Sequence, residues 1–133
     1  MTASQQRVLF YSAAVFNWAA CVMFFPMSGI SAAVGFTPLM THGPFDQIAL
    51  LAIALLGYGY WMVAGNPAAH RGIIVLGIIG KLGVVAIVFG HYFLVGDVNL
   101  AQALVTLGDV IYAALFIHVL RTSGELSPAT EKS

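Results

Sequence analysis

The chain has 133 residues, of which 60% are hydrophobic and 8% are charged, and its formal net charge is zero. Soluble domains carry about 25% charged residues, so this composition excludes an ordinary soluble domain and indicates that lipid is the main solvent. The zero net charge excludes the polybasic surface of a nucleic-acid-binding protein. The single cysteine, Cys21, excludes an intrachain disulfide and any CxxC redox or zinc site.

Four apolar runs predict four transmembrane helices, because a helix of about 20 residues spans the ~30 Å hydrocarbon core of a bilayer. The first run follows Arg7 and is longer than the apolar region of a typical signal peptide, so we interpret it as a retained helix. Pro26 ends the first run, and the turn at 65–67 ends the second. The predicted helices cover residues 7–25, 45–64, 72–95 and 98–120.

The predicted fold is an all-α membrane protein: one domain, 1–133, that forms an antiparallel up-down-up-down bundle of four transmembrane helices. The connection at 27–44 contains glycines and prolines but is too apolar for an ordinary exposed loop. We expect this connection to lie in the membrane interface or to fold back as a lid. The polar segment 121–133 is expected to be a mobile tail.

The basic residues predict the orientation. Arg7, Arg71, Arg121 and Lys132 all fall on the side that holds both termini, whereas the opposite side has no lysine or arginine. Cytoplasmic loops of membrane proteins carry an excess of these residues. The sequence therefore predicts that both termini are cytoplasmic.

A buried polar layer is predicted near the middle of the bundle. Asn17, Tyr58, Lys81 and Asp109, one from each helix, fall within about 6 Å of one level when depth is counted at 1.5 Å per residue. An unpaired ion at the bilayer centre costs from roughly 3 to well over 10 kcal/mol. We therefore expect Lys81 to pair with Asp109, and we expect Asn17 and Tyr58 to add hydrogen bonds and complete a ligand-binding layer.

Weaker candidates for the same layer share its predicted helix faces: Trp61, His91, Gln102 and Thr106. Two interpretations of the charged pair remain open. The pair either fixes the register of two helices and does nothing else, or it belongs to a ligand-binding or proton-linked site, because ions inside a membrane often mark such paths.

The remaining titratable residues predict no cofactor and no metal. His91 and His118 fall roughly 20 Å apart along the bundle axis, so they cannot ligate one haem iron from opposite sides. His42, Asp46, His91 and Asp97 share the outer face but lack the spacing of a metal site. No arrangement typical of a hydrolase and no glycine-rich phosphate loop occurs in the sequence, which favours a protein that is not an enzyme.

Three stretches carry a family resemblance: GYGYWMVAGNP at the end of the second helix, HRGIIVLGIIGKLGVV in the third and GDVIYAALFIHVLR in the fourth. On these motifs the chain from Phe45 onward resembles small bacterial four-helix membrane proteins of the DoxX-like kind. The resemblance implies a protein of the bacterial inner membrane with four helices, and it implies no activity for particular residues.

Two functions from different classes fit this pattern. The first is the binding or transport of a small apolar or amphipathic molecule, such as a lipid or a quinone, with Lys81 and Asp109 as its polar anchor. The alternative is a non-catalytic accessory or scaffold subunit of a larger membrane complex or homo-oligomer. A third candidate, an enzyme that acts on a quinone or lipid, has less support than either. A cavity beside Lys81 favours binding, whereas side chains that fill this space favour the scaffold.

Overall fold

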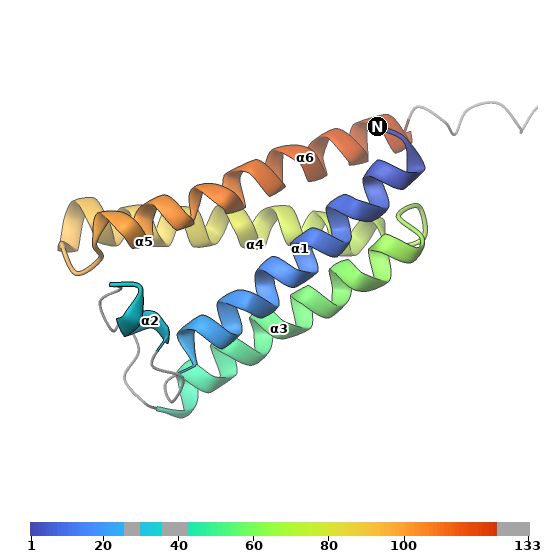
Figure 1. Cartoon of the computed structure of the whole chain (residues 1–133). Helices are drawn as coiled ribbons and strands as arrows, with labels where there is room; N and C mark the ends of the chain where they lie inside the picture. The colour runs from blue at the N-terminus through green and yellow to red at the C-terminus, as the bar shows by residue number, and fades with distance from the viewer. Residues whose placement is uncertain (26–29, 36–42, 125–133) are drawn as a thin grey trace, which may run out of the picture.

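The computed structural model describes residues 1–25, 30–35 and 43–124 of the chain. As predicted, the long helices form a four-helix antiparallel bundle, and no strand occurs in these residue ranges (Figure 1). Each of the four spans is long and apolar enough to cross a membrane. The spans are α1 (Ala3–Phe24), α3 (Pro44–Gly65), α4 (Arg71–Gly90) with its π-helical continuation η1 (His91–Val95), and α5 (Leu100–Val105) followed by α6 (Leu107–Gly124).

The helix ends differ from the prediction at both ends of the chain. α1 begins at Ala3 rather than Arg7, because the Thr2 hydroxyl accepts a hydrogen bond from the Gln5 backbone N–H and the Gln5 side chain accepts one from the Thr2 N–H. This reciprocal cap satisfies two N–H groups that have no partner inside the helix. α6 continues to Gly124, so the prediction of a tail from residue 121 is wrong up to that point. Residues 125–133 lie outside the described part of the chain.

The bundle consists of two antiparallel helix pairs, α1 with α3 and α4 with α6 (Figure 1). Gly57 lets the first pair approach closely, since a Cβ atom at this position would lie 2.7 Å from Nε1 of Trp18. The two pairs converge at the end that holds the N-terminus and diverge toward the opposite end, where α2 (Ile30–Ala33) lies between them (Figure 1). We call these the converging end and the diverging end.

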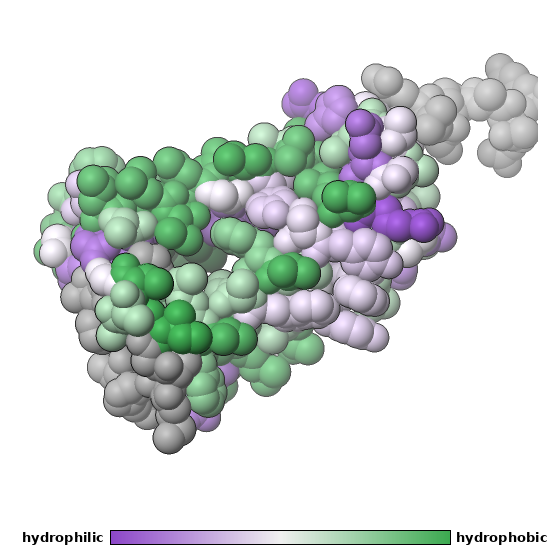
Figure 2. Space-filling view, in the orientation of Figure 1, coloured by the Kyte–Doolittle hydropathy of each residue, from purple (hydrophilic) through white to green (hydrophobic). Residues whose placement is uncertain are grey.

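The buried core occupies the half of the bundle near the converging end. The rings of Phe10 and Phe116 join α1 to α6 with 4.8 Å between their centroids, and Tyr60 of α3 packs edge-on against Phe116 at 5.1 Å. The core residues are Leu9, Phe10, Ala13, Ala14, Tyr60, Val63, Ala64, Ile74, Phe116 and Val119. In the half near the diverging end, apolar side chains gather on the outside of the molecule (Figure 2), as they do on helices that face lipid.

Part of the predicted lid falls within the described residues and contacts the start of α5. α2 ends in a turn at Gly35, where φ is +79°, a conformation that glycine adopts without strain. The carbonyl oxygen of Gly35 accepts a hydrogen bond of 3.0 Å from Nδ2 of Asn99, the residue that caps α5. The turn after α2 is therefore attached to the start of α5 at the diverging end. The rest of the predicted lid, at 27–29 and 36–42, lies outside the described residues.

Candidate functional site

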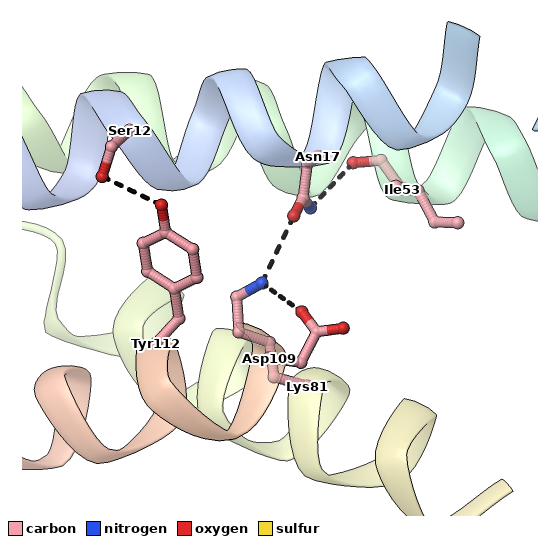
Figure 3. Close-up of polar contacts among 6 residues, drawn as sticks. All are labelled: Ser12, Asn17, Ile53, Lys81, Asp109 and Tyr112. Atoms are coloured by element: carbon pink, nitrogen blue, oxygen red, sulfur yellow. Dashed lines mark hydrogen bonds and ion pairs between the residues drawn. The ribbon is translucent and has the colours of Figure 1, made fainter. Parts of the chain in front are cut away.

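The predicted ion pair between the two charged residues forms. Nζ of Lys81 on α4 lies 2.7 Å from Oδ1 of Asp109 on α6 (Figure 3), and the two side chains are 5% and 13% exposed. The two helices are antiparallel neighbours, so a side chain from near the middle of α4 reaches one near the start of α6. The pair joins the two helices of one pair at a level where an isolated ion would be costly.

Asn17 connects this ion pair to the other helix pair. Its Oδ1 accepts a hydrogen bond of 3.4 Å from Nζ of Lys81, and its Nδ2 donates one of 3.2 Å to the carbonyl oxygen of Ile53 on α3 (Figure 3). The side chain is buried. Both ends of the amide are therefore used, and one residue of α1 contacts both α3 and α4.

Three aromatic rings surround the Lys81 ammonium group. Its Nζ lies 5.1 Å from the ring centroid of Tyr112, 5.3 Å from that of Phe16 and 5.5 Å from that of Tyr60. A cation within about 6 Å of a ring centroid is attracted to the negative face of the ring. We call these three rings, with Asp109 and Asn17, the cation cage.

Sequence reasoning missed the three rings of the cation cage as site residues. Tyr112 lies one helical turn after Asp109, so a search for aromatic residues at i+3 from a buried charge would have found it. Phe16 precedes Asn17 directly, and Gly108 makes room for it, because a Cβ atom there would lie 3.1 Å from the Phe16 ring. No comparable signal marks Tyr60.

The prediction that Tyr58 belongs to the polar layer is wrong. Its side chain is 58% exposed, whereas Tyr60 is completely buried. α3 turns its glycines toward its neighbours, with Gly57 against α1 and Gly59 against Ile73 of α4, because glycines permit close approach of the backbones. Tyr58 therefore lies on the outward face of α3.

Trp61 lies on the same outward face of α3 and is also outside the polar layer. Its side chain is 48% exposed, and its ring packs against Tyr11 at 4.7 Å and Trp18 at 5.9 Å between centroids. Trp18 in turn donates a hydrogen bond of 3.2 Å from Nε1 to the carbonyl oxygen of Ala54. This aromatic group fastens α1 to α3 and takes no part in the cation cage.

The structure does not bring the other three weaker candidates into the layer. Gln102 is buried, and its side chain caps α5 by accepting from the Asn99 N–H. The hydroxyl of Thr106 donates to the carbonyl oxygen of Ala103 at the break between α5 and α6. His91 pairs with Asp97 on the turn that follows α4, with 3.0 Å between Nδ1 and Oδ1.

One edge of the Asp109 carboxylate is left open. Oδ1 faces Lys81, and Oδ2 has no hydrogen-bond partner within residues 1–25, 30–35 and 43–124. Asp109 lies in the first turn of α6, where the helix dipole favours a negative charge. A second hydrogen bond joins the helix pairs nearby, from Oη of Tyr112 to Oγ of Ser12 at 3.1 Å (Figure 3).

The described ranges contain no group of three or more side chains placed to hold a metal ion. Of the outer-face residues considered for such a site, His42 lies outside these ranges. The arrangement that the geometry does provide is a cation held by a carboxylate, an amide oxygen and three rings, at the level where the two helix pairs meet. Comparison of the chain with protein-family models, with curated proteins and with solved structures finds no match.

Proposed function

We propose that the chain is a multi-pass membrane protein that binds or transports a small apolar or amphipathic molecule between its two helix pairs. The observation that carries this proposal is the open edge of the Asp109 carboxylate, whose Oδ2 has no hydrogen-bond partner among the described residues. A polar group at this depth is unfavourable in lipid, so its open side needs a polar partner or water. A bound molecule with one polar group and an apolar body meets both requirements.

The arrangement of the helix pairs supports the proposal. Near Lys81, the hydrogen bonds between them are those from Lys81 to Asn17 and from Tyr112 to Ser12, whereas the apolar core that the pairs share lies toward the converging end. Figure 2 shows the surface hollowed between the pairs. Ligand sites in membrane transporters lie between helix groups that move against one another. Two helix pairs whose shared core lies near the converging end suit such a movement at the diverging end.

We place the protein in the bacterial inner membrane with both termini in the cytoplasm, in keeping with its resemblance to DoxX-like proteins. Arg7, Arg71 and Arg121 all lie near the converging end, and the positive-inside bias assigns this end to the cytoplasm. Arg71 also joins α4 to α6 at this end, since its Nη2 donates a hydrogen bond of 3.2 Å to the carbonyl oxygen of Leu120.

A second candidate is a non-catalytic scaffold subunit that contacts a partner chain or a second copy of itself. The observation in its favour is that the cation cage already satisfies Lys81: the five side chains around the ammonium group belong to the chain itself. On this alternative the ion pair holds α4 against α6, and function resides on the outer surface.

Native mass spectrometry of the detergent-extracted protein separates the two candidates. We expect the wild-type protein to retain a small molecule, such as a lipid or a quinone. The double variant Lys81→Met/Asp109→Asn, which changes side-chain volume little, should lose this molecule while it keeps its helical circular dichroism. Retention of a partner chain by both proteins, with no small molecule bound to either, would instead establish the scaffold.

A further inference from the structure

We propose that the ligand of this site is an amphipathic organic cation and that Lys81 occupies its place when the site is empty. The inference rests on the proposed function, because it names the class of molecule that the same site would bind. It follows from the chemistry of the cation cage, whose members are Asp109, Asn17, Phe16, Tyr60 and Tyr112.

The cage has the composition of a receptor for an alkylated ammonium group. Rings that present their faces to one point are the usual means by which proteins hold quaternary ammonium ligands. The ring centroids lie between 5.1 and 5.5 Å from Nζ of Lys81, so one cationic centre is shared by all three. The carboxylate of Asp109 supplies the opposite charge at 2.7 Å. None of these contacts requires the cation to be a lysine.

The flexible side chain of Lys81 makes exchange of its ammonium group for another cation feasible. Its ammonium group sits at the end of a flexible four-carbon stem. The side chain of Asp109 keeps 13% of its surface exposed, which gives an incoming cation a first contact with the carboxylate.

The exchange involves no covalent chemistry. The organic cation takes the place of the ammonium group beside the Asp109 carboxylate, and the Lys81 side chain leaves the cage. No covalent bond forms or breaks in this step.

A matched pair of probes tests the charge requirement. Benzyltrimethylammonium is a cation, and neopentylbenzene is its neutral isostere with carbon in place of nitrogen. We expect the full-length protein in lipid nanodiscs to bind the cation in excess over the isostere in equilibrium dialysis, after subtraction of binding to empty nanodiscs.

Substitutions at the ion pair then give opposite effects. Lys81→Met removes the ammonium group that competes with the ligand, so we expect this variant to bind the cation roughly tenfold more tightly or better. Asp109→Asn should abolish cation binding. A variant that only disturbed the fold would weaken binding in both cases, so the gain in Lys81→Met is the distinguishing result.

Substitutions at the rings test the cage itself. Phe16→Leu removes one ring face and should weaken binding of the cation several-fold without affecting the isostere. Phe93→Leu is the matched control, since it makes the same change at a ring that is 73% exposed and lies outside the cation cage, so cation affinity should not change.

Equal binding of cation and isostere by wild type and Lys81→Met would overturn the cation inference and leave the apolar site of the proposed function standing. Absence of binding of either probe to both folded proteins would also overturn it, and the native mass spectra would still decide the proposed function separately. If Lys81→Met fails to fold, the wild-type protein alone decides, because equal binding of the cation and the isostere by the wild-type protein contradicts the inference.

Discussion

Replacement of Lys81 by methionine tests how strongly the ion pair stabilises the bundle. The change keeps an unbranched side chain of similar length but removes the donor that lies 2.7 Å from Asp109. The carboxylate is then left with its charge, mostly buried, and the bond to Asn17 is lost as well. Removal of one partner of a buried ion pair costs about 3–5 kcal/mol, and we expect Lys81→Met to fall in this range.

Asp109→Asn should be less harmful, for a reason visible in the structure. The amide oxygen of the new side chain can still accept a hydrogen bond from Lys81, and the ammonium group keeps Asn17 and the three ring faces. We therefore expect a loss of about 1–3 kcal/mol, the usual penalty for an imperfectly satisfied buried group. The double variant buries no charge and should be more stable than Lys81→Met alone.

The coupling between the two substitutions should reach about 3 kcal/mol, the upper end of the range for residues in direct contact. The free energies of unfolding of the wild-type protein, both single variants and the double variant are measured by circular dichroism during denaturation with SDS in mixed micelles. Strictly additive losses would refute the reasoning, because they would mean that Lys81 and Asp109 stabilise the protein independently. A double variant no more stable than Lys81→Met would refute it equally.

Three further predictions use other features of the structure. Gly77→Ala should destabilise the bundle by about 1–3 kcal/mol in the same SDS assay, because the added Cβ would lie 2.7 Å from the Tyr60 ring, whereas Gly83→Ala, with open space around it, should not. Tyr60→Phe should leave stability unchanged or raise it by up to about 1 kcal/mol, since its buried hydroxyl has no partner among the described residues. In a background without the native cysteine, a membrane-impermeant thiol reagent should label Asp97→Cys in intact spheroplasts and Ser133→Cys only after lysis.

The fold and the ion pair could be predicted because each depends on a strong and local constraint. The length of the apolar runs sets the four spans, since a shorter helix does not cross the hydrocarbon core. The burial of Lys81 and Asp109 follows from the energy of an ion in lipid, which leaves pairing as the favourable arrangement. Neither inference requires knowledge of which helix faces which.

Tyr58 shows what the sequence could not supply. Hydrophobic periodicity distinguishes core from surface when the surface faces water, but in this chain both are apolar. The orientation of α3 is instead determined by the glycines Gly57 and Gly59, which let α1 and α4 approach. For the same reason Tyr60 was overlooked: a tyrosine two residues from Tyr58 lies on the other side of the helix and becomes fully buried.

The position of the cation cage gives Lys81 two roles that depend on one charge. Its bond to Asp109 holds α4 against α6, and its bond to Asn17 joins that helix pair to α1 and α3. Removal of the ammonium group from the cage, by substitution or by the proposed displacement, therefore weakens the connection between the pairs. The proposed exchange would thus couple occupancy of the cage to separation of the helix pairs through the same ammonium group. A cation that takes the place of Lys81 would replace its contact with Asp109 but would not be tethered to α4, so the pairs would be freer to move while the ligand is bound.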